Sequence, residues 1–307
     1  MLLGAWYLVS NALENLEARR IASGFGFLWR EAGFEIGETT FLSFSAADAY
    51  LKALAVGLLN TFRVALLAIV FATMLGVIIG LARLSLNWLL AKIAAGYVEV
   101  MRNVPLVVQL FFWYAVITES LPAPAEALNP LPGVFLSNRG LAFPVPASLA
   151  PISIDYPILS GFNFTGGGFL SPEFTALVLG LILYTAAFIA EIVRAGILAV
   201  DRGQFEAGYS LGLSQRQLMR YIILPQALRV IVPPISSQYL NCTKNSSLAV
   251  AIGYPDLVSI ANTTINQTGQ AIEGIAIIML VYLTISLAIS GSMNWYNRRI
   301  ALRGTNT

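Results

Sequence analysis

Few residues in this sequence could carry out a chemical reaction. The chain has no histidine, which excludes histidine-ligated metal sites, Ser-His-Asp triads and histidine proton relays. Its single cysteine, Cys242, excludes an intrachain disulfide and a metal site with several cysteine ligands. No Gly-Lys-Ser/Thr loop that could cradle ATP is present. We therefore expect a protein that is not an enzyme and that holds no cofactor or metal of its own.

Polar side chains in or beside apolar segments could instead line a path for a solute, because ionisable groups at bilayer depth are costly and often functional. Glu191 and Arg194 could line such a path, or could form a neutralising i,i+3 pair at the membrane interface. Lys244 could line it or extend to the outer surface. The candidates for this solute pathway are Asn103, Gln109, Glu191, Arg194 and Lys244.

The composition identifies an integral membrane protein. The sequence is 57% hydrophobic and only 11% charged, whereas a soluble domain has about 25% charged residues. A net charge of +2 gives no indication of nucleic-acid binding. Pro105 is expected to break the second apolar segment, and Pro233 with Pro234 the fourth. We expect an all-α polytopic helical bundle with five spans, at residues 54–82, 87–117, 174–193, 222–250 and 274–297.

The distribution of basic residues predicts the orientation of these spans. The 194–229 loop and the C-terminus are basic and are expected in the cytoplasm, whereas the 119–173 and 251–273 loops contain one Lys or Arg between them. Residues 11–52 then lie outside. The short apolar segment Met1–Ser10 is expected to be an interfacial anchor or the end of a spanning helix whose first half is missing. We expect an N-terminal region at 1–52 and a transmembrane domain at 53–303 with an external loop at 118–173.

The polar stretch 201–225 carries its own helix signals. Asp201 can cap a short helix that ends at Gly212, where glycine can adopt the left-handed conformation. Ser214 and Gln217 form a capping-box pattern that begins a second helix, and Pro225 marks where this helix meets the next apolar segment. We expect a helix–turn–helix on the cytoplasmic face. The arginines in or beside it are Arg194, Arg202, Arg216, Arg220 and Arg229.

This stretch resembles the EAA loop of membrane permeases of ABC-type importers, with Gly208 in place of the third residue, alanine. In that family the loop is the coupling helix that docks onto a cytoplasmic ATPase. Gly208 and Gly212 are about one helical turn apart, and the bare face that they leave is expected to admit the partner's surface. The alternative is an amphipathic hairpin lying on lipid headgroups. The matching residues are Glu206, Ala207, Gly208, Gly212, Ile222, Leu224 and Pro225.

Further stretches are similar to polar amino-acid permeases. They are YVEV-x-RNVPL-x-VQLFFWY and YTAAFIAEIVRAGI, and SNRGLAFPVP resembles the general L-amino-acid branch. The resemblance implies a type I ABC importer permease in a bacterial inner membrane. It also implies two ABC ATPase subunits that bind ATP and Mg, a second permease subunit, identical or related, and an extracytoplasmic amino-acid-binding protein. Transport would proceed by alternating access, with Pro105, Pro233 and Pro234 as breaks in the moving helices.

Three other classes remain as alternatives. A secondary carrier needs no coupling loop and often shows inverted repeats, which this sequence does not show. A structural subunit of another membrane complex needs no catalytic residues, but would leave the loop unexplained. An intramembrane aspartyl enzyme is disfavoured because all four aspartates lie outside the expected spans. Co-purification with a nucleotide-binding protein would separate the permease from all three.

Overall fold

The structure is a computed structural model and describes Tyr7, Ser10, Asn11 and residues 23–149 and 152–301. Most of the apolar segment Met1–Ser10, expected to be an anchor or helix end, lies outside the described residues. The chain forms two compact units. The first unit comprises Met1–Phe62 and Pro255–Ser286, and the second comprises Arg63–Tyr254 and Leu287–Thr307. Helices α2 (Tyr50–Ala82) and α10 (Ala271–Ala301) contribute residues to both units.

All five predicted apolar segments lie in helices. In the described part of the chain, four helices are long and apolar enough to cross a membrane: α2, α5 (Pro172–Leu198), the helix Gln215–Ile252, and Ala271–Trp295 within α10. The second predicted segment is a bent pair, α3 (Trp88–Asn103) and α4 (Leu106–Ala115), which continues as a π-helical turn at Val116–Ser120. The axes of this pair differ by 104°, so it counts as a fifth crossing only if both halves form one span.

Side-chain caps explain where two of these helices begin. The Asn87 side chain accepts hydrogen bonds from the backbone N–H groups of Leu89 and Leu90, at 3.0 and 3.3 Å. The Ser171 hydroxyl accepts one from the backbone N–H of Phe174 at 3.1 Å, and Pro172 occupies the first turn. Asparagine and serine are favoured at this position, because a helix start leaves several backbone N–H groups without partners.

The expectation of an all-α protein is wrong in the 118–173 loop, which forms small antiparallel sheets. Pairs of short extended segments separated by glycines at positive φ, such as Gly133 (φ 78°) and Gly161 (φ 63°), favour hairpins over helices. Strands β1, β2, β3 and β8 form one sheet in that order, β4 pairs with β5, and β6 pairs with β7. After a 3-10 turn at Pro124–Glu126, the strands are β1 (Leu128–Leu131), β2 (Val134–Ser137), β3 (Gly140–Phe143), β4 (Val145–Leu149), β5 (Ile152–Asp155), β6 (Ile158–Ser160), β7 (Asn163–Thr165) and β8 (Gly168–Leu170).

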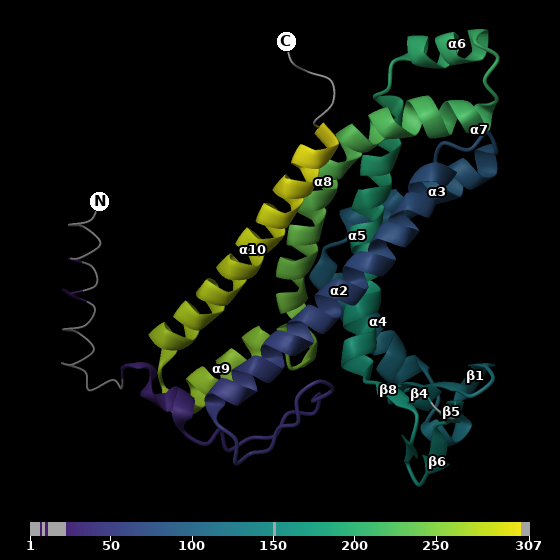
Figure 1. Ribbon diagram of the computed structural model, residues 1–307. Helices are drawn as coiled ribbons and strands as arrows, with labels where there is room; N and C mark the ends of the chain where they lie inside the picture. Colours follow the sequence, from purple (N-terminus) through teal and green to yellow (C-terminus); the bar gives the residue numbers. More distant parts are fainter. Residues whose placement is uncertain (1–6, 8–9, 12–22, 150–151, 302–307) are drawn as a thin grey trace. The chain divides into compact units, whose positions relative to one another are not determined.

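Helix α5 is the centre of the second unit and packs against α3, α4 and α8 (Leu224–Asn245). Within this unit, the strands lie at one end of α5, and the short helices α6 (Arg202–Ser210) and α7 (Gln215–Leu218) lie at its other end (Figure 1). Gly76 and Gly80 of α2 also lie against α5, since a Cβ atom at Gly76 would be 2.7 Å from Ile189 Cβ. These two glycines, four residues apart on α2, therefore allow α2 and α5 to pack closely.

Pro233 and Pro234 lie inside helix α8, whose assigned residues continue through both positions without a gap. The segment is nevertheless not straight, since α7 and the later part of α8 point in different directions (Figure 1). An interior proline removes one backbone hydrogen bond, and its ring meets the carbonyl group four residues earlier, so it favours a bend. The carbonyl groups that lose these bonds belong to Arg229 and Val230, which are exposed residues. A helix can retain such positions where neighbouring groups and local adjustments compensate. Beyond α8, a 3-10 helix at Ser246–Ile252 continues the chain.

The first unit contains a helix that the sequence analysis missed. Residues 251–273, expected to be an external loop, include α9 (Leu257–Thr268), whose buried side chains pack against the first turns of α2. Hydrogen bonds also fix the segment around the 3-10 turn Phe25–Trp29. The Glu273 carboxylate accepts one from the backbone N–H of Gly24 at 2.5 Å, and Gln270 Nε2 donates to the Gly24 carbonyl at 3.0 Å.

Asp256 caps α9 and is expected to make stability depend on pH. Its Oδ1 atom accepts a hydrogen bond from the backbone N–H of Ser259 at 2.8 Å, but its Oδ2 atom is buried without a partner among the described residues. Burial raises the pKa of Asp256 to about 7. The folded state therefore binds the proton more tightly than the unfolded state, and stability falls as pH rises from about 4 to about 7.

Asp256→Asn keeps the capping acceptor and removes the charge. We expect its stability relative to wild type to rise between pH 4.5 and pH 8, by at most about 1.4 kcal/mol of unfolding free energy per pH unit, and melting temperatures at both pH values measure this change. Asp48→Asn is the control, because a hydrogen bond from Lys52 lowers the pKa of Asp48 and its effect should not change over this pH range. A difference between Asp256→Asn and wild type that is the same at both pH values would contradict the prediction.

Candidate functional site

The segment Asp201–Leu218 forms the predicted helix–turn–helix. The Asp201 side chain accepts a hydrogen bond from the backbone N–H of Gly203 at 2.6 Å and caps α6. Gly212 has a φ of 76° in the turn, a conformation that favours glycine. Ser214 and Gln217 form both bonds of a capping box at the start of α7. The predicted caps and turn are therefore confirmed, and we call Asp201–Leu218 the cytoplasmic hairpin in view of its predicted side.

Gly208 faces into this hairpin, so the expectation that it presents a bare face to a partner is wrong. Gly208 is buried, and a Cβ atom at this position would overlap Cδ1 of Leu218. Leu218 is itself only 1% exposed. An added Cβ atom would therefore require the Leu218 side chain to shift, and in a packed interior such a shift costs stability. The glycine therefore sets the distance between α6 and α7.

The outward face of α6 is formed by other residues of the same motif. Glu206 and Ala207 are exposed. They lie beside two exposed apolar side chains, Tyr209 at 54% and Leu211 at 77%. No ion pair to Glu206 is found in the described part of the chain. Exposed apolar side chains that lie together, with polar groups at their edge, form the type of surface that binds another protein.

The hairpin is joined to α8 without a loop. A helix runs from Gln215 to Ile252, and a π-helical turn at Met219–Ile223 lies just before Pro225. In this turn the backbone N–H of Leu224 donates to the carbonyl of Met219, five residues earlier. Pro225 therefore does not interrupt the helix, because the wider turn accommodates a residue that has no N–H.

The break between α3 and α4 is stabilised by Gln109. Pro105 has no N–H to donate to the Met101 carbonyl, and this carbonyl accepts a hydrogen bond from Gln109 Nε2 at 2.9 Å instead. The same Nε2 atom donates to the Val104 carbonyl at 3.0 Å. Gln109 is only 5% exposed. Its side chain thus replaces backbone bonds that the bend removes.

Gln109→Met keeps the size of this side chain and removes both donors. We expect it to lower the unfolding free energy by about 1–3 kcal/mol, because the carbonyl groups of the partly buried residues Met101 and Val104 lose a partner. Thermal unfolding in detergent measures the effect. The control is Val108→Met on the same helix, since Val108 is 53% exposed. Equal melting temperatures for the two variants would show that Gln109 does not stabilise the break.

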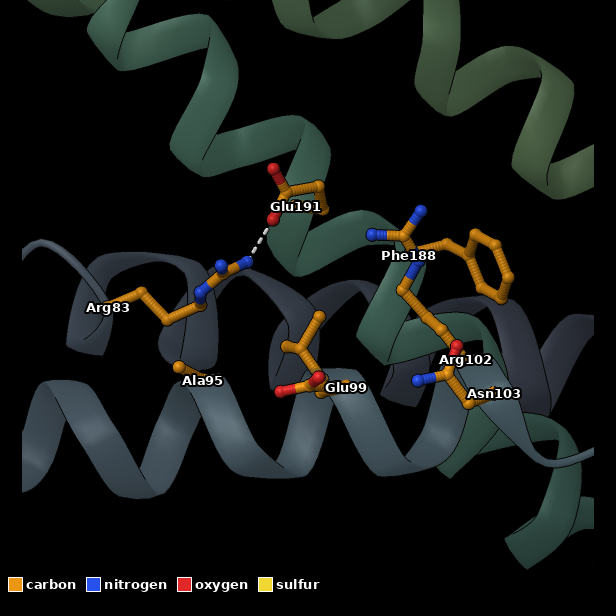
Figure 2. Close-up of a pocket in the computed structure, with 8 residues that line it drawn as sticks. Arg83, Ala95, Glu99, Arg102, Asn103, Phe188 and Glu191 are labelled. Carbon is orange, nitrogen blue, oxygen red and sulfur yellow. Dashed lines mark hydrogen bonds and ion pairs between the residues drawn. The ribbon is translucent and has the colours of Figure 1, made fainter.

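A charged cavity of about 530 Å³ lies between α3, α5 and the end of α2. Figure 2 shows Arg83 directed at Glu191 and Arg102 reaching from α3 toward Phe188 on α5. Glu191 accepts hydrogen bonds from Arg83 and from Arg194, the latter at 2.5 Å. The cavity is lined by Arg83, Ala95, Val98, Glu99, Arg102, Asn103, Phe188 and Glu191. It therefore presents two positive and two negative side chains.

A second cavity, of about 260 Å³, lies between α5 and α8 and contains no charged side chain. Three carboxamide groups and two hydroxyl groups give it hydrogen-bond donors and acceptors. We call it the amide cavity. Its lining residues are Tyr184, Thr185, Phe188, Gln238, Asn241, Cys242 and Asn245.

Comparison with known proteins identifies the family. Residues 72–302 match the family described as "Binding-protein-dependent transport system inner membrane component". The match covers most of the chain and includes the cytoplasmic hairpin and both cavities. The chain belongs to this family. The permease is therefore the membrane component of a transporter rather than an enzyme, as the sequence analysis predicted.

Relatives of the permease have names from amino-acid transport. It is 47% identical to the "Putative amino-acid ABC transporter permease protein YhdX" of Escherichia coli, with 96% of this chain and 90% of that protein covered. It is 42% identical to the "General L-amino acid transport system permease protein AapQ" of Rhizobium johnstonii, with 97% and 88% covered. The predicted resemblance to amino-acid permeases is therefore confirmed.

Solved structures support the fold of the permease. A crystal structure of an amino acid ABC transporter with histidines matches with a TM-score of 0.59 and 29% identity, over 81% of this chain and 95% of that chain. The MetNI methionine ABC transporter matches with a TM-score of 0.58 and 16% identity, over 82% and 97%. At 16% identity the second match shows the fold alone.

The five predicted pathway residues of the permease lie at different places in the structure. Asn103 and Glu191 line the charged cavity. Arg194 pairs with Glu191, Gln109 is buried at the helix break, and Lys244 is exposed outside both cavities. Sequence reasoning missed several lining residues, namely Arg83, Phe188, Gln238, Asn241 and Asn245. The amides of α8 could have been found from their spacing of three to four residues.

Proposed function

We propose that the chain is the permease subunit of an ATP-driven amino-acid importer, and that the cytoplasmic hairpin couples it to two ABC ATPase subunits that bind ATP and Mg. The observation that carries this proposal is the hairpin itself. Its exposed face holds Glu206, Ala207, Tyr209 and Leu211, while Gly208 fixes its inner face. The remaining residues of the motif, Gly212, Ile222, Leu224 and Pro225, shape the turn and the junction with α8.

The proposed arrangement is a type I importer permease in a bacterial inner membrane. It has five spans, and its C-terminus is cytoplasmic. Residues 1–52 form an N-terminal region that is mainly external, and residues 53–303 form the transmembrane domain. The 118–173 loop is external and the 201–225 loop is cytoplasmic. A second permease subunit and an extracytoplasmic amino-acid-binding protein complete the transporter. The basic residues of the cytoplasmic loops support this orientation.

The two cavities are the proposed substrate pathway. An amino acid carries one positive and one negative group, and the charged cavity offers arginine and glutamate side chains of both signs. Asn103 and Glu191 belong to this cavity, and Arg194 holds Glu191 in place. The uncharged amide cavity provides hydrogen-bond partners for a polar substrate. Buried polar groups of this type discriminate strongly between ligands that satisfy them and ligands that do not.

The proposed mechanism is alternating access. ATP binding closes the ATPases and displaces the hairpin. The continuous helix Gln215–Ile252 transmits this displacement to the amide cavity, because Gln238, Asn241 and Asn245 lie on it. The hinge is the bend at Pro105, where backbone hydrogen bonds are replaced by those of a single side chain.

Reconstitution tests this function. The chain is co-expressed with its ATPase and companion permease, and uptake of radiolabelled amino acids is measured in proteoliposomes in competition with all twenty. We expect ATP-dependent uptake of one group of amino acids and co-purification of the ATPase. A chain that purifies without an ATPase, or a complex that takes up no amino acid, would refute the proposal.

A further inference from the structure

The two cavities share one wall. Among the described residues, Phe188 alone lines both the charged cavity and the amide cavity. Its side chain is half-buried on α5. The face toward the charged cavity meets Arg102, whose Cζ atom is 5.1 Å from the ring centroid. Toward the amide cavity, the ring of Tyr184 lies at a centroid distance of 4.9 Å.

Other contacts fix the helices that hold this ring. The Tyr97 hydroxyl donates to the Leu183 carbonyl at 2.7 Å and links α3 to α5. Val98 packs against Ala187 and Ala190 in a buried cluster of the same two helices. Because α3 and α5 are joined at these points, Arg102 stays opposite Phe188. The ring itself is only half-buried and borders both cavities beside its contacts with Arg102 and Tyr184.

We propose that Phe188 is an aromatic gate between the two cavities and that Arg102 holds it closed through a cation–π contact. A change of the Phe188 rotamer would join the two cavities without moving either helix. The inference rests on the function proposed above, because it places the gate on the substrate pathway. In the absence of transport, the Phe188 ring would prevent solutes from leaking between the charged cavity and the amide cavity.

The single cysteine of the chain provides the test. Cys242 lines the amide cavity and is 1% exposed. A charged, membrane-impermeant methanethiosulfonate is added to inside-out vesicles that contain the full complex without ATP, and labelling of the permease chain is followed with time. With Phe188→Ala we expect labelling to accelerate by about tenfold or more, because a gate that is open only a small fraction of the time is removed. Arg102→Met should accelerate it by roughly two- to tenfold.

Phe188→Tyr keeps the ring and should label at the wild-type rate. Phe111→Ala, an exposed aromatic of α4 that lines neither cavity, is the matched control. Unchanged labelling in Phe188→Ala, or equal acceleration in Phe111→Ala, would overturn the gate. Labelling does not require transport, so a complex that takes up no amino acid would refute the proposed function while the gate could still be judged.

Discussion

Gly208→Ala should weaken transport in this chain, although it adds a single methyl group and restores the alanine that the importer motif has at this position. The new Cβ atom would overlap Leu218 Cδ1 in the interior of the cytoplasmic hairpin. Overpacking of this type costs about 1–3 kcal/mol, which corresponds to roughly 5- to 150-fold in an equilibrium. We expect α6 to move away from α7 and the ATPase to bind more weakly by this factor. Co-purification and ATP-dependent uptake measure the loss.

A second substitution shows whether the overlap is the cause. In Gly208→Ala with Leu218→Ala, the atom that blocks the new methyl group is absent, and the next neighbour, Ile222 Cδ1, is 3.4 Å away. The double variant should therefore bind the ATPase better than Gly208→Ala alone, despite the lost leucine. If it binds no better, Gly208 acts by contact with the partner rather than by packing inside the hairpin.

Glu191→Gln should weaken the contact between α2 and α5 and reduce uptake. Glu191 accepts hydrogen bonds from both Arg83 and Arg194, so the substitution leaves two arginines without their counter-charge. Removing one member of a fully buried ion pair costs about 3–5 kcal/mol. The three side chains are 17–30% exposed, so we expect about 1–3 kcal/mol after screening by solvent. Thermal unfolding measures this loss.

Glu99→Gln is the matched control for this experiment. Glu99 lines the same charged cavity, but no ion pair to it is found in the described part of the chain. Both substitutions remove one negative charge from the cavity, and only one of them breaks an ion-pair network. A melting temperature that falls equally in both variants would show that the network with Arg83 and Arg194 contributes nothing specific.

The local parts of the fold could be predicted because their causes are local. Asp201, Gly212 and Ser214 each act within three residues, so the hairpin followed from spacing alone. The apolar segments were equally clear because a helix that crosses a bilayer needs about 20 apolar residues. The sheets of the 118–173 loop were missed because such short strands have weak sequence signals, and α9 was missed because polar residues interrupt it.

The candidate site was harder to predict because it depends on contacts between distant segments. Gln109 looked like a pathway residue, but its donors are used by carbonyl groups that only the bend makes available. Gly208 looked like a partner contact, and only the fold reveals that Leu218 lies against it. Phe188 has no polar group and gave no signal at all. Its position between two cavities follows from the packing of three helices.

The bent course of the helix from Gln215 to Ile252 has a mechanical consequence. Helix α7 and the later part of α8 point in different directions, although no loop separates them (Figure 1). A displacement of the hairpin along the axis of α7 would therefore reach the amide groups at Gln238 and Asn241 as a movement across the axis of α8. A flexible linker would absorb the same displacement as thermal motion.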